Sequence, residues 1–146
     1  MKKIEVQIWI QRPVEDVYNY VTTFEEWPKW RMDVVEARML TEGPLRVGAQ
    51  GRGVGKLLGR HLTIDVEITA LEPAVAFGYR PTAGPLRTNN LYTFKGQDGG
   101  TLIVLTDEIR MTGFARILEP LMPGLVRSGY RKNLEGLKAV LEAQPA

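Results

Sequence analysis

The chain has 146 residues, with no cysteine, one histidine and a formal net charge of +2 from 19 basic and 17 acidic side chains. This length suits one domain, residues 1–146, which buries about two thirds of the surface that the unfolded chain exposes. The small charge does not require a nucleic-acid partner. The lack of cysteine excludes a disulfide framework and, with a single histidine, a zinc cluster.

The N-terminal segment begins with a short alternating run, which predicts a strand over residues 3–10 and not a signal peptide. No stretch approaches the ~18 apolar residues of a membrane-spanning helix, so we expect a soluble cytoplasmic protein without a membrane span. Pro13 suits the first turn of a helix, and the following VEDVYNYVTTF has apolar residues at helical spacing. A second short helical segment is predicted around residues 24–29.

The middle of the chain alternates with period two and is divided by turn sequences such as TEGP, LEPA, RPTAGP and GQDGG. This pattern predicts six further strands, at about 33–41, 48–58, 61–71, 75–80, 87–95 and 101–112. From about residue 114 the period becomes helical, with Pro120 and Pro123 in the first turns. The order of elements predicts an α+β domain in which a seven-stranded antiparallel sheet curls around one long C-terminal helix.

The stretch VGAQGRGVGKLLGR resembles a phosphate-binding loop but misses the fixed positions of both common motifs. Gln50 stands where the first P-loop glycine belongs, and Leu57 stands where the magnesium-binding hydroxyl belongs. The dinucleotide pattern also fails, and the following RHLTIDVEI reads as a strand and not as a helix. We therefore expect no nucleotide site and no other cofactor.

Three segments carry a family resemblance: RPVEDVYNYVTTFEEWPKW, VGAQGRGVGKLLGRHLTIDVEITALEP and YTFKGQDGGTLIVLT. With this order of elements, the chain resembles the SRPBCC superfamily, the helix-grip fold of START and birch-pollen-allergen domains. Within it, the chain is similar to the polyketide cyclase/dehydrase-like branch. The resemblance implies an internal apolar cavity between the sheet and the long helix, used for lipid or aromatic-ligand binding, transport or catalysis. It brings no catalytic set of residues.

In that family pattern, Gly51, Gly53 and Gly55 share the cavity-facing row of their strand with Leu57. One interpretation is that these glycines let a strongly curled strand bend under the helix. The other is that they leave volume for a ligand, and both can hold.

Asp107 interrupts the apolar row formed by Ile103, Leu105, Ile109 and Met111 in the last strand. A carboxylate that points into an apolar interior is costly unless it is paired, and desolvation should raise its pKa. Asp107 is therefore the candidate catalytic residue. The alternatives are a bulge that turns it outward, or a place at a wet cavity mouth.

Other residues that could contact a ligand come from three elements. Strand 87–95 places polar groups on one face, the neighbouring strand adds a phenol, and the apolar face of the long helix adds a glycine and an amide. The members of this set are Thr88, Asn90, Tyr92, Tyr79, Gly129 and Asn133. A few convergent polar groups in an apolar pocket are typical of a small-molecule site. Trp9, on the polar row of the first strand, leaves open a homodimer.

Three functions are compatible with the sequence. The first is a carrier or sensor that binds a hydrophobic small molecule in an internal cavity. The second is a polyketide cyclase/dehydratase-like enzyme in which Asp107 acts as general acid or base. The third is a protein-interaction module, which a filled interior would favour.

Overall fold

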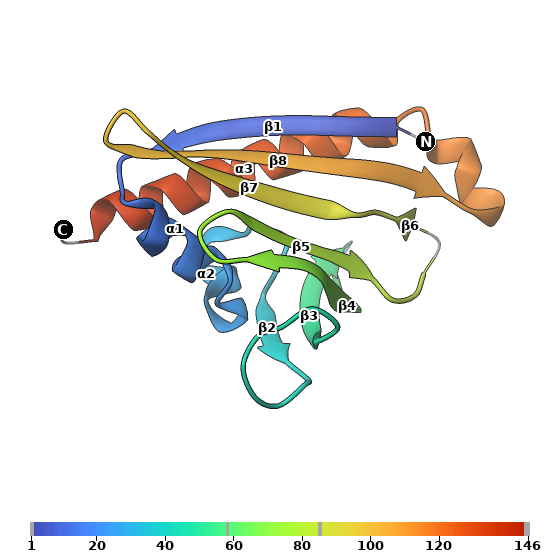
Figure 1. The fold of residues 1–146 in the computed structure, drawn as a ribbon. Coiled ribbons are helices and arrows are strands. Elements are labelled where there is room, and N and C mark those ends of the chain that lie inside the picture. Colours follow the sequence, from blue (N-terminus) through green and yellow to red (C-terminus); the bar gives the residue numbers. More distant parts are fainter. Residues whose placement is uncertain (1, 58, 85, 145–146) are drawn as a thin grey trace.

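The computed structural model describes residues 2–57, 59–84 and 86–144. Its main element is one antiparallel sheet, and the long helix α3 (Met122–Ala143) packs across one face of it, called here the inner face (Figure 1). The strands are β1 (Lys2–Ile10), β2 (Glu36–Met39), β3 (Gln50–Leu57), β4 (Arg60–Glu72), β5 (Ala76–Pro81), β6 (Leu86–Arg87), β7 (Asn90–Gln97) and β8 (Gly100–Met111). The strand order is β1-β8-β7-β5-β4-β3-β2, and the two-residue β6 pairs with β8 off this path.

Short helices follow the first strand, as predicted: α1 (Val14–Val21), the 3-10 turn η1 (Phe24–Glu26) and α2 (Trp27–Trp30). Their aromatic residues form a stack in the core, where the Phe24 and Trp27 rings lie 4.0 Å apart and Trp27 also meets Phe77 of β5. The predicted α+β fold, with a seven-stranded sheet around a long C-terminal helix, is confirmed.

Two predicted elements differ in detail from the structure. The strand predicted at 87–95 is divided into β6 and β7, because Thr88 and Asn89 lie between two ladders. The helix predicted from about residue 114 begins at Met122, after the 3-10 helix η2 (Gly113–Leu118). Pro120 lies between η2 and α3, which agrees with the exclusion of proline from helix interiors. No helix in the described part of the chain is long and apolar enough to cross a membrane.

The glycine-rich stretch is a strand, as predicted, and not a loop that leads into a helix. β3 pairs with β2 on one side and with β4 on the other, from Gln50↔Glu67 to Leu57↔Arg60. This register places Gly51, Gly53 and Gly55 opposite Val66, Ile64 and Leu62, on the inner row of β4.

Candidate ligand-binding site

A cavity of about 370 Å³ lies between the inner face of the sheet and the first half of α3. Its walls come from β3, β4, β5, the start of β7, α3 and the segment that links α2 to β2. Met32 and Ile64 at its margin are 76% and 42% exposed, so the cavity opens to solvent beside them. Its size lies within the range of small-molecule sites.

The three glycines of β3 differ in what surrounds them. A Cβ at Gly51 would lie 2.4 Å from the Phe24 ring, and a Cβ at Gly55 would lie 2.6 Å from the Asp33 carbonyl oxygen. A Cβ at Gly53 would meet nothing closer than the Ile64 carbonyl oxygen at 4.0 Å. Gly53 therefore leaves open volume in the cavity, whereas Gly51 and Gly55 allow other parts of the chain to approach the strand closely.

Asp107 lies on the inner row of β8 and is 1% exposed. Its Oδ1 accepts a hydrogen bond of 2.8 Å from the Asn89 backbone N–H, and its Oδ2 accepts one of 2.5 Å from the Tyr130 hydroxyl. Burial raises the pKa of Asp107 above its usual value, although both hydrogen bonds favour the ionised form. Burial also raises the pKa of Tyr130, and the adjacent Asp107 charge raises it further.

Tyr130 separates Asp107 from the cavity. Tyr130 is among the residues that line the cavity, and Asp107 is not. A ligand in the cavity would therefore meet the phenol of Tyr130, with the carboxylate behind it.

Asn90 brings an unsatisfied amide to the cavity wall. The residue is 5% exposed, and its side-chain oxygen has no hydrogen-bond partner. Its side-chain nitrogen donates only a long hydrogen bond of 3.5 Å to the Thr88 hydroxyl. Since buried polar groups are normally paired, this amide is free to bind a polar group of a ligand.

Arg31 organises a second polar cluster at the cavity. Its Nη1 donates a hydrogen bond of 2.7 Å to the Tyr79 hydroxyl, and its guanidinium holds Asp33 through Nε and Nη2 at 3.1 and 2.9 Å. The guanidinium also lies 4.7 Å from the centre of the Trp27 ring, within cation–π range. Burial alone would raise the pKa of Asp33, but the Arg31 charge and the hydrogen bonds that the carboxylate accepts, from Arg31 and Asn133 among others, together lower it.

Asn133 joins this cluster to α3. Its side-chain oxygen accepts a hydrogen bond of 3.0 Å from the Met32 backbone N–H, and its side-chain nitrogen donates one of 3.1 Å to Asp33 Oδ1. The amide thus has partners on the segment that links α2 to β2, and it fixes that segment against the helix.

Most of the candidate residues predicted from the sequence gather at the cavity. Those that line it are Gly53, Gly55, Tyr79, Thr88, Asn90, Gly129 and Asn133. Three candidates do not line it: Gly51 lies under Phe24, Tyr92 is buried in the core beside Tyr79, and Asp107 is behind Tyr130. The reason is that alternation predicts the face of a strand but not which neighbour covers that face.

Four polar residues that line the cavity were not predicted as site residues: Arg31, Asp33, Tyr130 and Lys132. Arg31 lies outside the predicted strands and helices, so no periodic pattern assigns it to a face. Tyr130 falls on the apolar face of the long helix, where a tyrosine is usually interpreted as part of the hydrophobic core. A signal for Tyr130 was present, since buried tyrosine hydroxyls require a partner and Asp107 is a buried acceptor.

The side chain of Trp9 has partners within its own chain. The Trp9 indole N–H donates a hydrogen bond of 2.8 Å to the Gln97 carbonyl oxygen, and the Lys138 ammonium lies 5.5 Å from its ring centre. Trp9 therefore has contacts within its own chain and gives no argument for a partner subunit. Among the described residues, no group of three or more His, Asp or Glu side chains is placed to hold a metal ion.

The fold agrees with the comparisons to known proteins. The chain matches the family described as "Polyketide cyclase / dehydrase and lipid transport" over residues 1–142, and it belongs to that family, within the SRPBCC superfamily. No curated protein matches the chain at the sequence level.

Solved structures share the helix-grip fold at low sequence identity. TTHA0849 from Thermus thermophilus is 21% identical with a TM-score of 0.82, and the match covers 99% of this chain and 100% of that one. Ara h 8.0201 is 14% identical with a TM-score of 0.76, covering 98% and 99%. The di-domain ARO/CYC StfQ from the steffimycin biosynthetic pathway is 16% identical with a TM-score of 0.77, covering 94% of this chain and 49% of that one. These matches define the fold.

Proposed function

We propose that this protein binds a small, largely apolar molecule in the cavity between the sheet and α3, as a carrier or sensor. The family includes lipid-transport proteins, and the cavity combines apolar and aromatic walls with few polar groups. The polar groups at the cavity include Asn90 on β7, Tyr79 on β5 and Tyr130 on α3, in addition to the Arg31 cluster. Such a site orients one molecule without any covalent chemistry.

The observation that carries this proposal is the unpaired side-chain oxygen of Asn90. Leaving a buried polar group without a partner costs about 1–3 kcal/mol. A ligand with one hydroxyl group would donate the missing hydrogen bond to the Asn90 oxygen, while its apolar body would cover Val66 and Trp27. The free protein is thus prepared for a ligand that is apolar with a polar substituent.

The test compares two identical substitutions in the sheet, Gly53→Leu and Gly96→Leu. Gly53 lines the cavity, whereas Gly96 is exposed on β7, and a Cβ would have room at both positions. With 2-naphthol as the probe, isothermal titration calorimetry should show at least a tenfold loss of affinity for Gly53→Leu. Gly96→Leu should remain within twofold of the wild type. Equal affinity of both variants would exclude the cavity as the binding site.

A second measurement identifies a natural ligand. Native mass spectrometry of the protein as purified should show an additional mass of a small organic molecule, and this mass should be reduced in Gly53→Leu. An additional mass that persists in Gly53→Leu at the wild-type level would place the molecule elsewhere on the protein.

The contact between Tyr130 and Asp107 favours a second candidate function, acid–base catalysis of the cyclase or dehydratase kind. Asp107 is too deep to reach a ligand, so a proton would pass through the Tyr130 hydroxyl at the cavity wall. Asn90 and Tyr79 would orient the substrate.

Tyr130→Phe and Asp107→Asn distinguish this enzyme from a carrier. An enzyme should lose turnover of a poly-β-ketone substrate in both variants, while a carrier should keep its 2-naphthol affinity within a few fold in both. The third possibility, an interaction module with a filled interior, has no support from this cavity.

A further inference from the structure

The sheet opens between β5 and β7, at the edge of the inner cavity. Their ladder runs from Ala76↔Thr93 to Tyr79↔Asn90 and ends there. The next two pairs in this register would be Arg80 with Asn89 and Pro81 with Thr88, but neither pair is formed. A proline cannot donate to a ladder, so the pairing has a chemical reason to stop at this point.

Beyond that point, each of the two segments forms hydrogen bonds with the strand on its other side. On the β5 side, the Thr82 N–H donates a hydrogen bond of 2.9 Å to the Asp65 carbonyl oxygen of β4. On the β7 side, the Asn89 N–H donates to the Asp107 side chain, and Arg87 pairs with Arg110 of β8. The opening is therefore held by hydrogen bonds on both sides.

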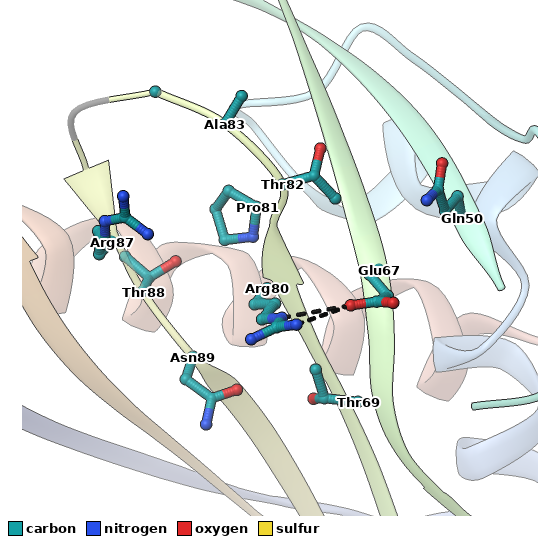
Figure 2. Close-up of a pocket in the computed structure, with 11 residues that line it drawn as sticks. Gln50, Glu67, Thr69, Arg80, Pro81, Thr82, Ala83, Arg87, Thr88 and Asn89 are labelled. Carbon is teal, nitrogen blue, oxygen red and sulfur yellow. Dashed lines mark hydrogen bonds and ion pairs between the residues drawn. The ribbon is translucent and has the colours of Figure 1, made fainter. Parts of the chain in front are cut away.

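A groove of about 700 Å³ lies over this opening on the outer face of the sheet. Figure 2 shows Arg87, Thr88 and Asn89 along one wall and Arg80 and Pro81 along the other. Pro81 and Thr88 border both this groove and the inner cavity. Pro81 and Thr88 thus lie between the two spaces, where the ladder is missing.

The outer groove is polar and has an excess of positive charge. Arg80 donates through Nε and Nη2 to one Glu67 oxygen, which leaves N–H groups of its guanidinium available. Arg87 is exposed and lies directly opposite Arg110 in the β6–β8 ladder. Within the described part of the chain, neither Arg87 nor Arg110 forms an ion pair, and Glu67 is the only acid that borders the groove.

An anion near Arg87 would reduce the charge repulsion between Arg87 and Arg110. Like charges directly opposite each other in a ladder are destabilising, and Glu108, the nearby acid on the outer row of β8, pairs with neither arginine. Arginine binds a carboxylate or phosphate with directed hydrogen bonds.

We propose that the outer groove binds the anionic end of the ligand. The ligand is then an anionic amphiphile whose apolar body lies in the inner cavity and whose charged group passes between Pro81 and Thr88 to Arg87. This inference rests on the proposed function, because it assigns a ligand class to the same cavity.

The test uses two probes of equal chain length, decanoate and decan-1-ol, at pH 8 and low salt. Isothermal titration calorimetry on the wild type should give about tenfold tighter binding of decanoate, the scale of one charge-assisted hydrogen bond. Arg87→Gln should lower decanoate affinity about fivefold to tenfold and leave decan-1-ol within twofold. Lys95→Gln removes one exposed charge near the far end of β7, outside the outer groove, and should leave the affinity for both probes unchanged.

Backbone amide shifts provide a second readout that does not depend on a variant. Decanoate should shift the signals of Arg87 and Asn89 in the wild type, and decan-1-ol should shift mainly those of Gly53 and Gly129.

The outcomes separate the two proposals. Suppose that decan-1-ol binds but Arg87→Gln leaves the decanoate affinity unchanged, or that Lys95→Gln lowers this affinity as much as Arg87→Gln does. Either result excludes the outer site and leaves the cavity proposal intact. If neither probe binds and 2-naphthol also fails, the cavity proposal falls, and the outer site with it.

Discussion

The two halves of α3 differ in what lies beneath them. The C-terminal half carries Leu134, Leu137 and Leu141, which are at most 1% exposed, and a Cβ at Gly136 would lie 2.5 Å from the Trp30 carbonyl oxygen. The N-terminal half carries Gly129 at the cavity wall and Leu125, which is 68% exposed. One half is thus packed, and the other is open.

The short helices explain the difference. Figure 1 shows α1 and α2 near the C-terminal half of α3, and the contacts between α2 and α3 agree with this placement. The inner row of β4 shows the same division, since Val66 and Ile68 are buried while Leu62 and Ile64 are exposed. An apolar row therefore becomes core only where another element covers it, and the uncovered part is the surface that we propose binds the ligand.

The largest expected effect compares two leucines of α3. Leu137→Ala removes a fully buried side chain and should lower the free energy of unfolding by about 2–5 kcal/mol. Leu125→Ala removes an exposed side chain and should change it by less than about 0.5 kcal/mol. Urea unfolding followed by circular dichroism measures both. Similar losses in the two variants would contradict the division into a packed half and an open half.

Alanine substitutions at two glycines of α3 should change the free energy of unfolding with opposite signs. Gly136→Ala places a methyl group against the Trp30 backbone and should destabilise the protein by about 1–3 kcal/mol, the usual cost of overpacking. Gly129→Ala meets no atom within 4 Å and should stabilise it by about 0.5–1 kcal/mol, because alanine favours the helix. The same methyl group narrows the cavity, so Gly129→Ala should also weaken 2-naphthol binding. Destabilisation by Gly129→Ala would show that the open half is tighter than described.

This division shows which features the sequence could predict. The alternating and helical periods depend on local geometry, and they correctly indicated the sheet, the long helix and the inward rows that hold Asn90 and Asp107. Which part of a row is covered depends on helices that are far away in the sequence, and so Gly51 and Gly53 could not be told apart. Arg31 was missed because it lies outside any periodic element, and its role follows only from its contact with Tyr79.

Replacing the polar side chain of Asn90 tests whether the cavity under the open half of α3 binds a polar group of a ligand. Replacing it with leucine removes a buried oxygen that has no partner, so Asn90→Leu should stabilise the free protein by about 1 kcal/mol. The same change should weaken 2-naphthol binding, because the ligand hydroxyl loses its partner. Thermal unfolding with and without 2-naphthol measures both effects. The opposite pattern, a less stable protein with unchanged binding, would mean that the amide serves the fold and not a ligand.

The smallest expected effect concerns the charge of Asp107. Burial raises the pKa of this carboxyl in the folded protein above the ordinary value of 3.8. The folded state therefore holds the proton more tightly than the unfolded state, and the carboxyl destabilises the fold increasingly as pH rises through and above 3.8. In Asp107→Asn the new amide cannot ionise, and it can keep the hydrogen bond from the Asn89 N–H while its nitrogen donates to the Tyr130 oxygen. The stability of Asp107→Asn relative to the wild type should thus improve between pH 3 and pH 7.

Urea unfolding at several pH values measures this slope, and Asp98→Asn, at an exposed turn, provides the baseline. A slope of the opposite sign would mean that the hydrogen bonds from Tyr130 and Asn89 outweigh desolvation, and that Asp107 is a structural anion that holds α3 to the sheet.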